Sequence, residues 1–204
     1  MGGTPGTDVR ALSQADMRQV LSALAPVDGA AWQALEALLG SVTWKKDEHL
    51  VRTGERVRYA HFLVEGIVRV YHAHGGTEYN KTFFVPGMFP TLLTALLTNE
   101  PCRLGFQALT PARTLRFPFA AFQDLFHEHR CLETVMRRVL EIEWSNKERH
   151  DIRMVTEDAT ANYLTFRKEL PGLEDLVPQY HIASYLGVTP VQLSRIRAKL
   201  VGRG

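Results

Sequence analysis

The chain has 204 residues, of which 45% are hydrophobic, so it can form one large or two small domains with a substantial core. Because its formal net charge is only +2, any strong attraction to acidic partners must come from local basic segments and not from the protein as a whole. The longest apolar stretch, residues 88–97, is too short to span a bilayer and is broken by Pro90. We therefore expect a cytoplasmic protein that makes no contact with a membrane.

Cysteine usage and the first residues exclude two further classes of protein. Cys102 and Cys131 are too few for a disulfide framework or for a multi-cysteine metal or cluster site, and no cofactor is expected. The chain begins with Met-Gly-Gly-Thr-Pro-Gly, which lacks the charged and apolar regions of a signal peptide. Residues 1–12 are therefore expected to be a disordered lead-in.

Two helices followed by a set of short strands are predicted for the first part of the chain. Residues 13–24 and 28–39 have the spacing of amphipathic helices, and each begins with a capping side chain, Ser13 or Asp28. Short β-rich runs separated by turn glycines then indicate a small antiparallel barrel or roll. The predicted strands contain Trp44 and residues 50–51, 62–64, 67–70, 82–85, 104–109 and 114–117. Helical spacing resumes over residues 119–126.

A long helix is predicted next, from about Cys131 to Met154, and it carries two adjacent apolar rows. The first row is Leu132, Val135, Val139 and Ile142, and the second is Met136, Leu140 and Trp144. One row can cover the roll and the other a partner helix, which favours a homodimer through residues 131–154. The alternative is a single wide face buried within one chain.

Residues 179–197 are predicted to form two helices joined by a tight turn, after a separate helix over residues 159–170. Gly187 lies in the turn, where a positive φ is needed, Thr189 can cap the second helix, and Pro190 occupies its first position. This pattern is typical of a helix-turn-helix. The exposed face of the second helix is predicted to carry Gln192, Ser194, Arg195, Arg197 and Lys199.

The charge of this C-terminal region favours DNA binding. From Leu176 onward the chain contains no acidic residue, but it contains three arginines and one lysine. The negatively charged phosphate backbone of DNA is attracted to such a basic region. The alternative is purely structural, because helix pairs with a glycine turn are common and a basic last turn also suits a helix C-terminus through the helix dipole.

The order of a roll, a long helix and a C-terminal helix-turn-helix resembles the Crp/Fnr superfamily of bacterial transcription regulators. The resemblance is carried by Gly54-Glu55, residues 62–70, Pro86-Gly87 and residues 177–197. It implies an α+β fold with an N-terminal antiparallel β-roll of the cupin-like jelly-roll type and flanking helices. The implied domains are a sensor roll over 13–128, a dimerisation helix over 129–156, and a winged-helix-like helix-turn-helix domain over 157–204 with a short or absent wing. The implied protein is a homodimer rather than an enzyme, with palindromic double-stranded DNA and RNA polymerase as partners.

The resemblance also assigns DNA contacts to individual residues. Arg195 falls on the family's base-reading arginine, which is best suited to guanine O6 and N7. Gln192 is expected to read a base beside it, whereas Val191 can touch only a thymine methyl group. Ser194 belongs to the same exposed face. The residues expected to position phosphates are Gln179, Thr189, Arg197 and Lys199.

The roll departs from the family's pattern for cyclic nucleotides. Residues 90–93, Pro-Thr-Leu-Leu, replace the family's Gly-Glu-Leu, and Cys102 replaces the arginine that holds the cyclic phosphate. Leu92 cannot accept a hydrogen bond from a ribose hydroxyl, and Arg103 is expected to face away from Cys102. We therefore expect no tight cyclic AMP binding, and the effector is unknown. Its expected pocket is lined by Phe89, Thr91, Leu92, Cys102 and Arg103.

A cupin-like enzyme that binds a divalent metal is the competing interpretation. Gly66, His72, His74 and Glu78 reproduce the spacing of the first cupin metal motif. On a strand the two histidines point to the same face, and Glu78 returns across a glycine turn, so the three side chains could hold a metal ion. Because the second cupin motif is absent, the regulator is favoured and no metal is expected.

Overall fold

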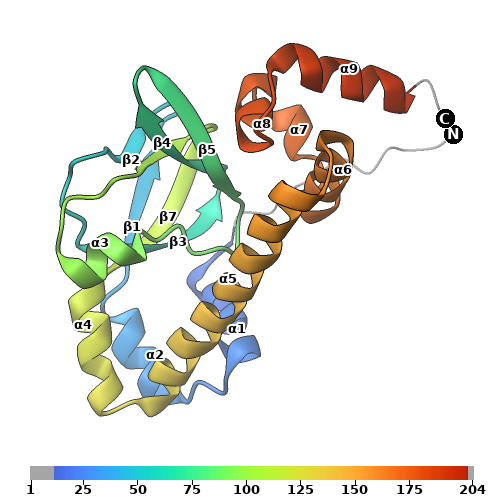
Figure 1. Ribbon diagram of the computed structural model, residues 1–204. Helices are drawn as coiled ribbons and strands as arrows, with labels where there is room; N and C mark the ends of the chain where they lie inside the picture. The colour runs from blue at the N-terminus through green and yellow to red at the C-terminus, as the bar shows by residue number, and fades with distance from the viewer. Residues whose placement is uncertain (1–11, 202–204) are drawn as a thin grey trace, which may run out of the picture.

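The computed structural model describes residues 12–201. Residues 1–11, most of the predicted lead-in, and residues 202–204 lie outside the described part, whereas the backbone amide of Leu12 donates a hydrogen bond to the Val64 carbonyl oxygen at 2.9 Å. The predicted α+β order is confirmed, with N-terminal helices, a roll of antiparallel strands, one long helix and a group of C-terminal helices (Figure 1).

The roll consists of two antiparallel sheets, which we call sheet A and sheet B. Sheet A has the order β1-β7-β3 and contains β1 (Gly40–Trp44), β7 (Ala112–Pro118) and β3 (Tyr59–Glu65). Sheet B has the order β2-β6-β4-β5 and contains β2 (His49–Val51), β6 (Gly105–Ala108), β4 (Val68–His74) and β5 (Thr77–Phe84). Each predicted run overlaps one of these strands, and β4 extends well beyond its predicted end.

The N-terminal helices begin at the predicted caps. The Ser13 hydroxyl oxygen accepts a hydrogen bond from the backbone amide of Asp16, and the Asp28 carboxylate accepts one from the amide of Ala31. The helices before residue 130 are α1 (Gln14–Leu24), α2 (Gly29–Glu36), α3 (Leu93–Thr98), α4 (Phe119–Asp124) and the 3-10 turn η1 (Leu125–His127). Those after it are α5 (Arg130–Thr156), α6 (Ala159–Glu169), α7 (Leu173–Leu176), α8 (Gln179–Tyr185) and α9 (Pro190–Val201). The short helices α3 and α7 were not predicted.

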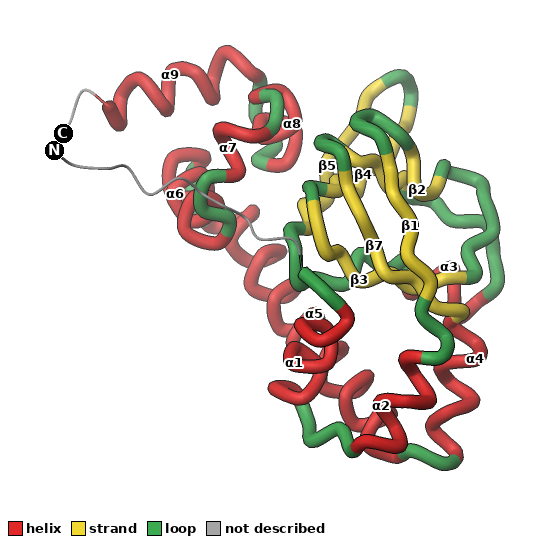
Figure 2. Tube along the Cα trace, turned by 180° about the vertical axis from the view of Figure 1, so that it is seen from behind, coloured by secondary structure: helices red, strands yellow, loops and turns green. Residues whose placement is uncertain are grey.

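Three apolar clusters hold the layers together. The first lies between sheet A and the helices α1, α2, α4 and α5, and it includes Phe62 and Leu132. The second fills the interior of the roll, with Val70 and Phe106 among its members. The third joins Phe83 of sheet B to α6, α8 and α9. The outer face of sheet B is therefore covered in part, and the C-terminal helices lie beside β5 in both views of the molecule (Figures 1 and 2).

The long helix α5 does not divide its two predicted apolar rows into a buried and an exposed one, because Met136 of the second row packs against the first cluster and Ile142 of the first is 46% exposed. Leu132 and Val135 are buried in the first cluster, which confirms the inward face predicted for the start of the helix. Trp144 is 71% exposed, and beyond a polar segment at residues 145–151 further apolar side chains are exposed near the helix end, with Val155 at 86%. We call the set Leu140, Trp144, Ile152 and Val155 the exposed strip of α5.

One irregularity in the pairing of β4 with β5 decides which side chains face the C-terminal helices. Thr82 lies opposite Val70, whereas Asn80 lies opposite Tyr71, so Lys81 is an extra residue in β5. This is a β-bulge, and it reverses the alternation of side chains in the residues before it. As a result, Asn80 points outward, toward α8, rather than into the roll.

Gly66 is required where β3 turns into β4. Its φ is +88°, and a Cβ added there would lie 2.4 Å from the Pro111 carbonyl oxygen and 2.7 Å from the Ala112 Cα. Gly66→Ala should therefore lower the free energy of unfolding by more than ~3 kcal/mol, because backbone strain and a backbone clash act together. Gly76→Ala is the matched control: its φ is +78° but no atom lies within 4 Å, so a loss of about 1 kcal/mol is expected. Urea unfolding measures both, and equal losses would contradict the clash.

His61 should make the protein sensitive to acid. Its ring is buried on sheet A with Nδ1 3.2 Å from the Thr114 hydroxyl, and burial together with the nearby Arg116 charge lowers the pKa of His61 to about 4. His61 therefore takes up a proton near pH 6.5 in the unfolded chain but only near pH 4 in the folded chain. The free energy of unfolding consequently falls as the pH drops from 6.5 toward 4. His61 should contribute a loss of about 2 kcal/mol between pH 7.5 and pH 5. Urea unfolding of His61→Gln should show that much less acid sensitivity; an unchanged pH dependence would contradict this.

Candidate DNA interface and sensor cavity

The predicted helix-turn-helix is present as α8, a turn and α9. Gly187 has the expected positive φ of 67°. The Thr189 hydroxyl oxygen accepts a hydrogen bond from the backbone amide of Gln192 at 3.2 Å, and the Gln192 side-chain oxygen accepts one from the amide of Thr189 at 2.8 Å. This reciprocal arrangement is a capping box, which fixes the start of α9. The Gln192 side chain, predicted to read a base, is thus turned toward the backbone of its own helix.

The outward face of α9 is exposed, as predicted. Leu193 is fully buried in the core of the C-terminal helices, so the opposite side of the helix faces solvent. Val191 is 61% exposed, and Arg195 is exposed one turn further along. The predicted contact residues on the exposed surface are Thr189, Val191, Gln192, Ser194, Arg195 and Lys199. Two of them, Arg195 and Lys199, are basic, and Val191 is the apolar member.

Two predicted phosphate contacts are less accessible than the others. Arg197 is half-buried and lies on the side of α9 toward Tyr163, whose pKa is raised to about 12 by burial and by its hydrogen bond to Glu174, against the opposing effect of the Arg197 charge. Gln179 is also half-buried, and its side-chain nitrogen donates to the Glu174 carbonyl oxygen at 3.3 Å. Gln179 is therefore already bonded within the C-terminal region, and Arg197 is only half exposed to a DNA phosphate.

The five residues predicted to line an effector pocket do not lie together. Leu92 and Cys102 are buried in the apolar interior of the roll. The Cys102 thiol donates a hydrogen bond to the Arg52 carbonyl oxygen at 3.1 Å, and burial raises its pKa. Arg103 is exposed at the surface, which agrees with its expected direction away from Cys102. The positions that hold ribose and phosphate in the related pattern are thus filled by packed apolar groups.

The other two, Phe89 and Thr91, line a separate cavity of about 340 Å³. It lies between α1, sheet A, the loop before α3, and α5, with Met17 and Val135 among the buried residues of its wall. Most of the lining is apolar, and Glu143 is its one ionisable side chain. Leu140 and Ile142, both partly exposed, stand at its edge on α5. The segment 89–93 therefore has Leu92 in the roll interior and its neighbours on the cavity side.

The predicted convergence of His72, His74 and Glu78 is wrong. Glu78 lies opposite Ala73 in the hairpin, so its side chain is on the other face from both histidines. The two imidazole rings stack on each other with centroids 6.3 Å apart, while the Glu78 carboxylate pairs with Arg69 at 2.6 Å. Within residues 12–201, no group of three His, Cys, Asp or Glu side chains is placed to hold a metal ion. The cupin-like interpretation therefore lacks the three metal ligands on which it depended.

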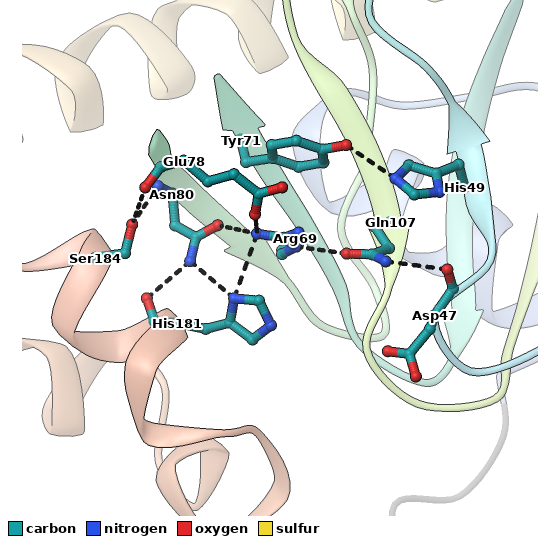
Figure 3. A network of polar contacts seen from close by, with 9 residues as sticks. All are labelled: Asp47, His49, Arg69, Tyr71, Glu78, Asn80, Gln107, His181 and Ser184. Carbon is teal, nitrogen blue, oxygen red and sulfur yellow. Dashed lines mark hydrogen bonds and ion pairs between the residues drawn. The ribbon is translucent and has the colours of Figure 1, made fainter. Parts of the chain in front are cut away.

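Sequence reasoning missed a polar cluster between the roll and the helix-turn-helix. Arg69 and Asn80 of sheet B meet His181 and Ser184 of α8 (Figure 3). No function was predicted for these four residues. Arg69 interrupts an otherwise apolar strand of the roll, and a charged residue in such a run signals a buried polar partner. The identity of that partner, however, depends on how distant segments pack.

Comparison with known proteins agrees with the observed architecture. The cyclic nucleotide-binding domain family matches residues 41–129. None of the curated protein sequences matches the chain. The structure of FixK2 from Bradyrhizobium japonicum is similar, with a TM-score of 0.69 and 19% identity over 81% of this chain and 86% of that one. The c-di-GMP responsive global regulator CLP of Xanthomonas campestris has a TM-score of 0.68 and 15% identity, over 87% of this chain and 93% of that one. A CooA mutant from Carboxydothermus hydrogenoformans has a TM-score of 0.65 and 19% identity, over 82% and 78%.

These likenesses confirm the predicted resemblance and fold class. Residues 41–129 match the model of the cyclic nucleotide-binding domain, and the chain shares its fold with FixK2, CLP and the CooA mutant. None of the helices in the described range 12–201 combines the length and apolar character that a membrane span requires.

Proposed function

We propose that this protein is a DNA-binding transcription regulator of Crp/Fnr type. The observation that carries the proposal is the exposed face of α9, which presents Arg195 and Lys199 from a rigidly capped helix, in a region without acidic residues from Leu176 onward. Such a helix fits the major groove, and its N-terminal residues can reach base edges. The structurally similar CLP is described as a global regulator, which supports the same function here.

The regulator acts as a homodimer through α5. The exposed strip of α5 has apolar side chains on one side of the helix, before and after a polar segment at residues 145–151, and it offers apolar surface for an interhelical contact. A two-fold pair of α5 helices gives two copies of α9, which suits a palindromic site with half-sites about 10 base pairs apart. RNA polymerase is the partner that such a regulator would recruit or exclude.

In vitro selection from random duplexes should test both DNA binding and the dimer. The wild-type protein should enrich a palindrome with half-sites spaced by a whole number of helical turns.

On the selected duplex, Arg195→Ala should cost about 1–3 kcal/mol at its cognate base pair, because a bidentate contact to guanine is lost. Lys199→Ala should weaken specific and random DNA alike, since a phosphate contact carries no sequence information. Fluorescence anisotropy measures both; equal losses on specific and random DNA for Arg195→Ala would refute its base-reading role.

The effector is an uncharged, largely apolar small molecule that occupies the 340 Å³ cavity. The wall residues Met17, Leu35 and Val135 are at most 2% exposed, so the cavity reaches the core from an open side beside Leu140 and Ile142 of α5. An anion is disfavoured by the Glu143 carboxylate, whereas the Thr91 hydroxyl can bond one polar group of the ligand. Because α5 forms one wall, occupancy can alter the helix that joins the two protomers.

Thermal unfolding with 1-naphthol as the probe should test this effector class. Saturating 1-naphthol should stabilise the protein by roughly 2–3 kcal/mol if it reaches about 100 times its Kd. The anion 1-naphthoate, which has the same ring system, should shift the melting temperature much less. Ala60→Leu, which fills part of the wall, should abolish the shift by 1-naphthol while the protein remains folded. Equal shifts from both probes, or an undiminished shift in Ala60→Leu, would contradict the site.

A further inference from the structure

The helix-turn-helix is attached to the sensor roll by more than the chain connection through α5. On the apolar side of the contact, Phe83 of β5 is buried between two aromatic rings of the C-terminal domain. Its ring centroid lies 5.6 Å from that of Tyr185 and 6.1 Å from that of Phe166. Such ring pairs stabilise packing beyond the area that they bury. The roll and the C-terminal helices therefore share a core.

The polar side of the contact is centred on a buried guanidinium. Arg69 is 4% exposed, and its Nη1 lies 2.9 Å from the Asn80 side-chain oxygen and 3.3 Å from Nδ1 of His181. The remaining groups around the guanidinium are the Glu78 carboxylate at 2.6 Å and the Gln107 side-chain oxygen, to which Nε donates at 2.7 Å (Figure 3). A buried cation with several acceptors fixes its neighbours in one geometry.

Backbone groups on both sides complete the contact. The backbone amide of Asn80 donates to the Ser184 hydroxyl at 2.9 Å, and that hydroxyl donates to the Glu78 carbonyl oxygen at 2.9 Å. The Asn80 side-chain nitrogen donates to the His181 carbonyl oxygen at 2.9 Å. Three hydrogen bonds thus run between β5 and α8 without involving a long, mobile side chain, and separating the two elements would leave them unmade.

The contact requires a neutral His181. Both Arg69 and Asn80 direct N–H groups at its Nδ1, so this nitrogen is an acceptor and the ring proton is on Nε2. Burial and the Arg69 charge lower the pKa of His181 to about 4, against the opposing effects of Glu78 and Asp47. At neutral pH the imidazole therefore stays uncharged and the contact stays intact.

Docking covers α8 but leaves the recognition helix free. His181 and Ser184 face the roll, whereas Arg195 and Lys199 of α9 remain exposed. We propose that the cluster of Arg69, Asn80, His181 and Ser184 is a latch that fixes the helix-turn-helix on the sensor roll, so that the roll sets the direction in which α9 faces DNA. The proposal rests on the proposed function of the chain as a dimeric DNA-binding regulator.

The latch has a specific consequence for DNA binding. In a dimer, two latched helix-turn-helix units have a fixed spacing, and both can meet a palindrome without a further loss of freedom. Opening the latch leaves each unit able to bind a half-site, but the second unit must then be ordered on the DNA. Loss of the latch should therefore weaken palindrome binding by roughly tenfold and leave half-site binding unchanged within about twofold.

Two variants remove the latch from opposite sides of the contact. Ser184→Ala deletes the hydroxyl on α8 and keeps good helix propensity. Asn80→Ala deletes the side-chain amide on β5 and leaves the backbone amide in place. Ser22→Ala is the matched control, because Ser22 is exposed on α1, far from α8 in the fold. The duplexes are the palindrome selected by the wild-type protein and the same duplex with one half-site scrambled.

Hydrogen exchange shows whether the latch has opened. Peptides that cover β5 and α8 should exchange faster in Ser184→Ala and in Asn80→Ala than in the wild type or in Ser22→Ala, with α1 unchanged. Palindrome affinity should fall in both variants, and half-site affinity should not. This joint result would support the latch, and the use of two variants keeps the test valid if one of them folds poorly.

Three other results would each overturn an identifiable claim. If both variants bind the palindrome as well as the wild type does, the latch has no positioning role. If they bind it more tightly, the docked state restrains DNA binding and the proposed direction of the effect is wrong. If the wild-type protein enriches no duplex at all, the proposed DNA-binding function is wrong. The proposed role of the latch in orienting α9 is then wrong as well, even where hydrogen exchange shows that the contact between β5 and α8 exists.

Discussion

The contact between the outer face of sheet B and the C-terminal helices is the constraint on which the rest of the structure depends. Val70 and Phe106 face the interior of the roll, while Phe83 and Arg69 face the C-terminal helices. A sheet covered in this way needs apolar side chains in both directions, and any polar group on it needs a buried partner. Strands β4 and β5 therefore contribute to the interior of the roll on one face and to the contact with the C-terminal helices on the other.

Features governed by neighbours in the chain could be predicted from the sequence. Ser13, Asp28 and Thr189 cap their helices as expected, and Gly187 adopts the positive φ that the turn requires. The solvent-facing side of α9 follows from helical periodicity alone, so most of the candidate DNA interface was predictable. Gln192 shows the limit: its spacing from Thr189 also satisfies a capping box, and the structure uses it for that purpose.

Features that depend on distant packing could not be predicted. Arg69 and His181 are separated by 112 residues, and no local pattern indicates that they meet. The five residues predicted to line an effector pocket do not lie together, for a related reason. Alignment to a family pattern placed Leu92 and Thr91 in one site, but adjacent residues of an extended segment face opposite ways. One of them packs inside the roll and the other lines the cavity beside α5.

The single extra residue at Lys81 makes the chain unusually sensitive to changes in length at this point. Deleting one residue from β5 would restore regular alternation and turn the side chain of Asn80 into the roll. The hairpin itself would survive, because its strands would still pair, and the helix-turn-helix would still fold around its own core. What would be lost is the connection between the two. An insertion or deletion in this strand would therefore separate the roll from the helix-turn-helix within a lineage while leaving both folded.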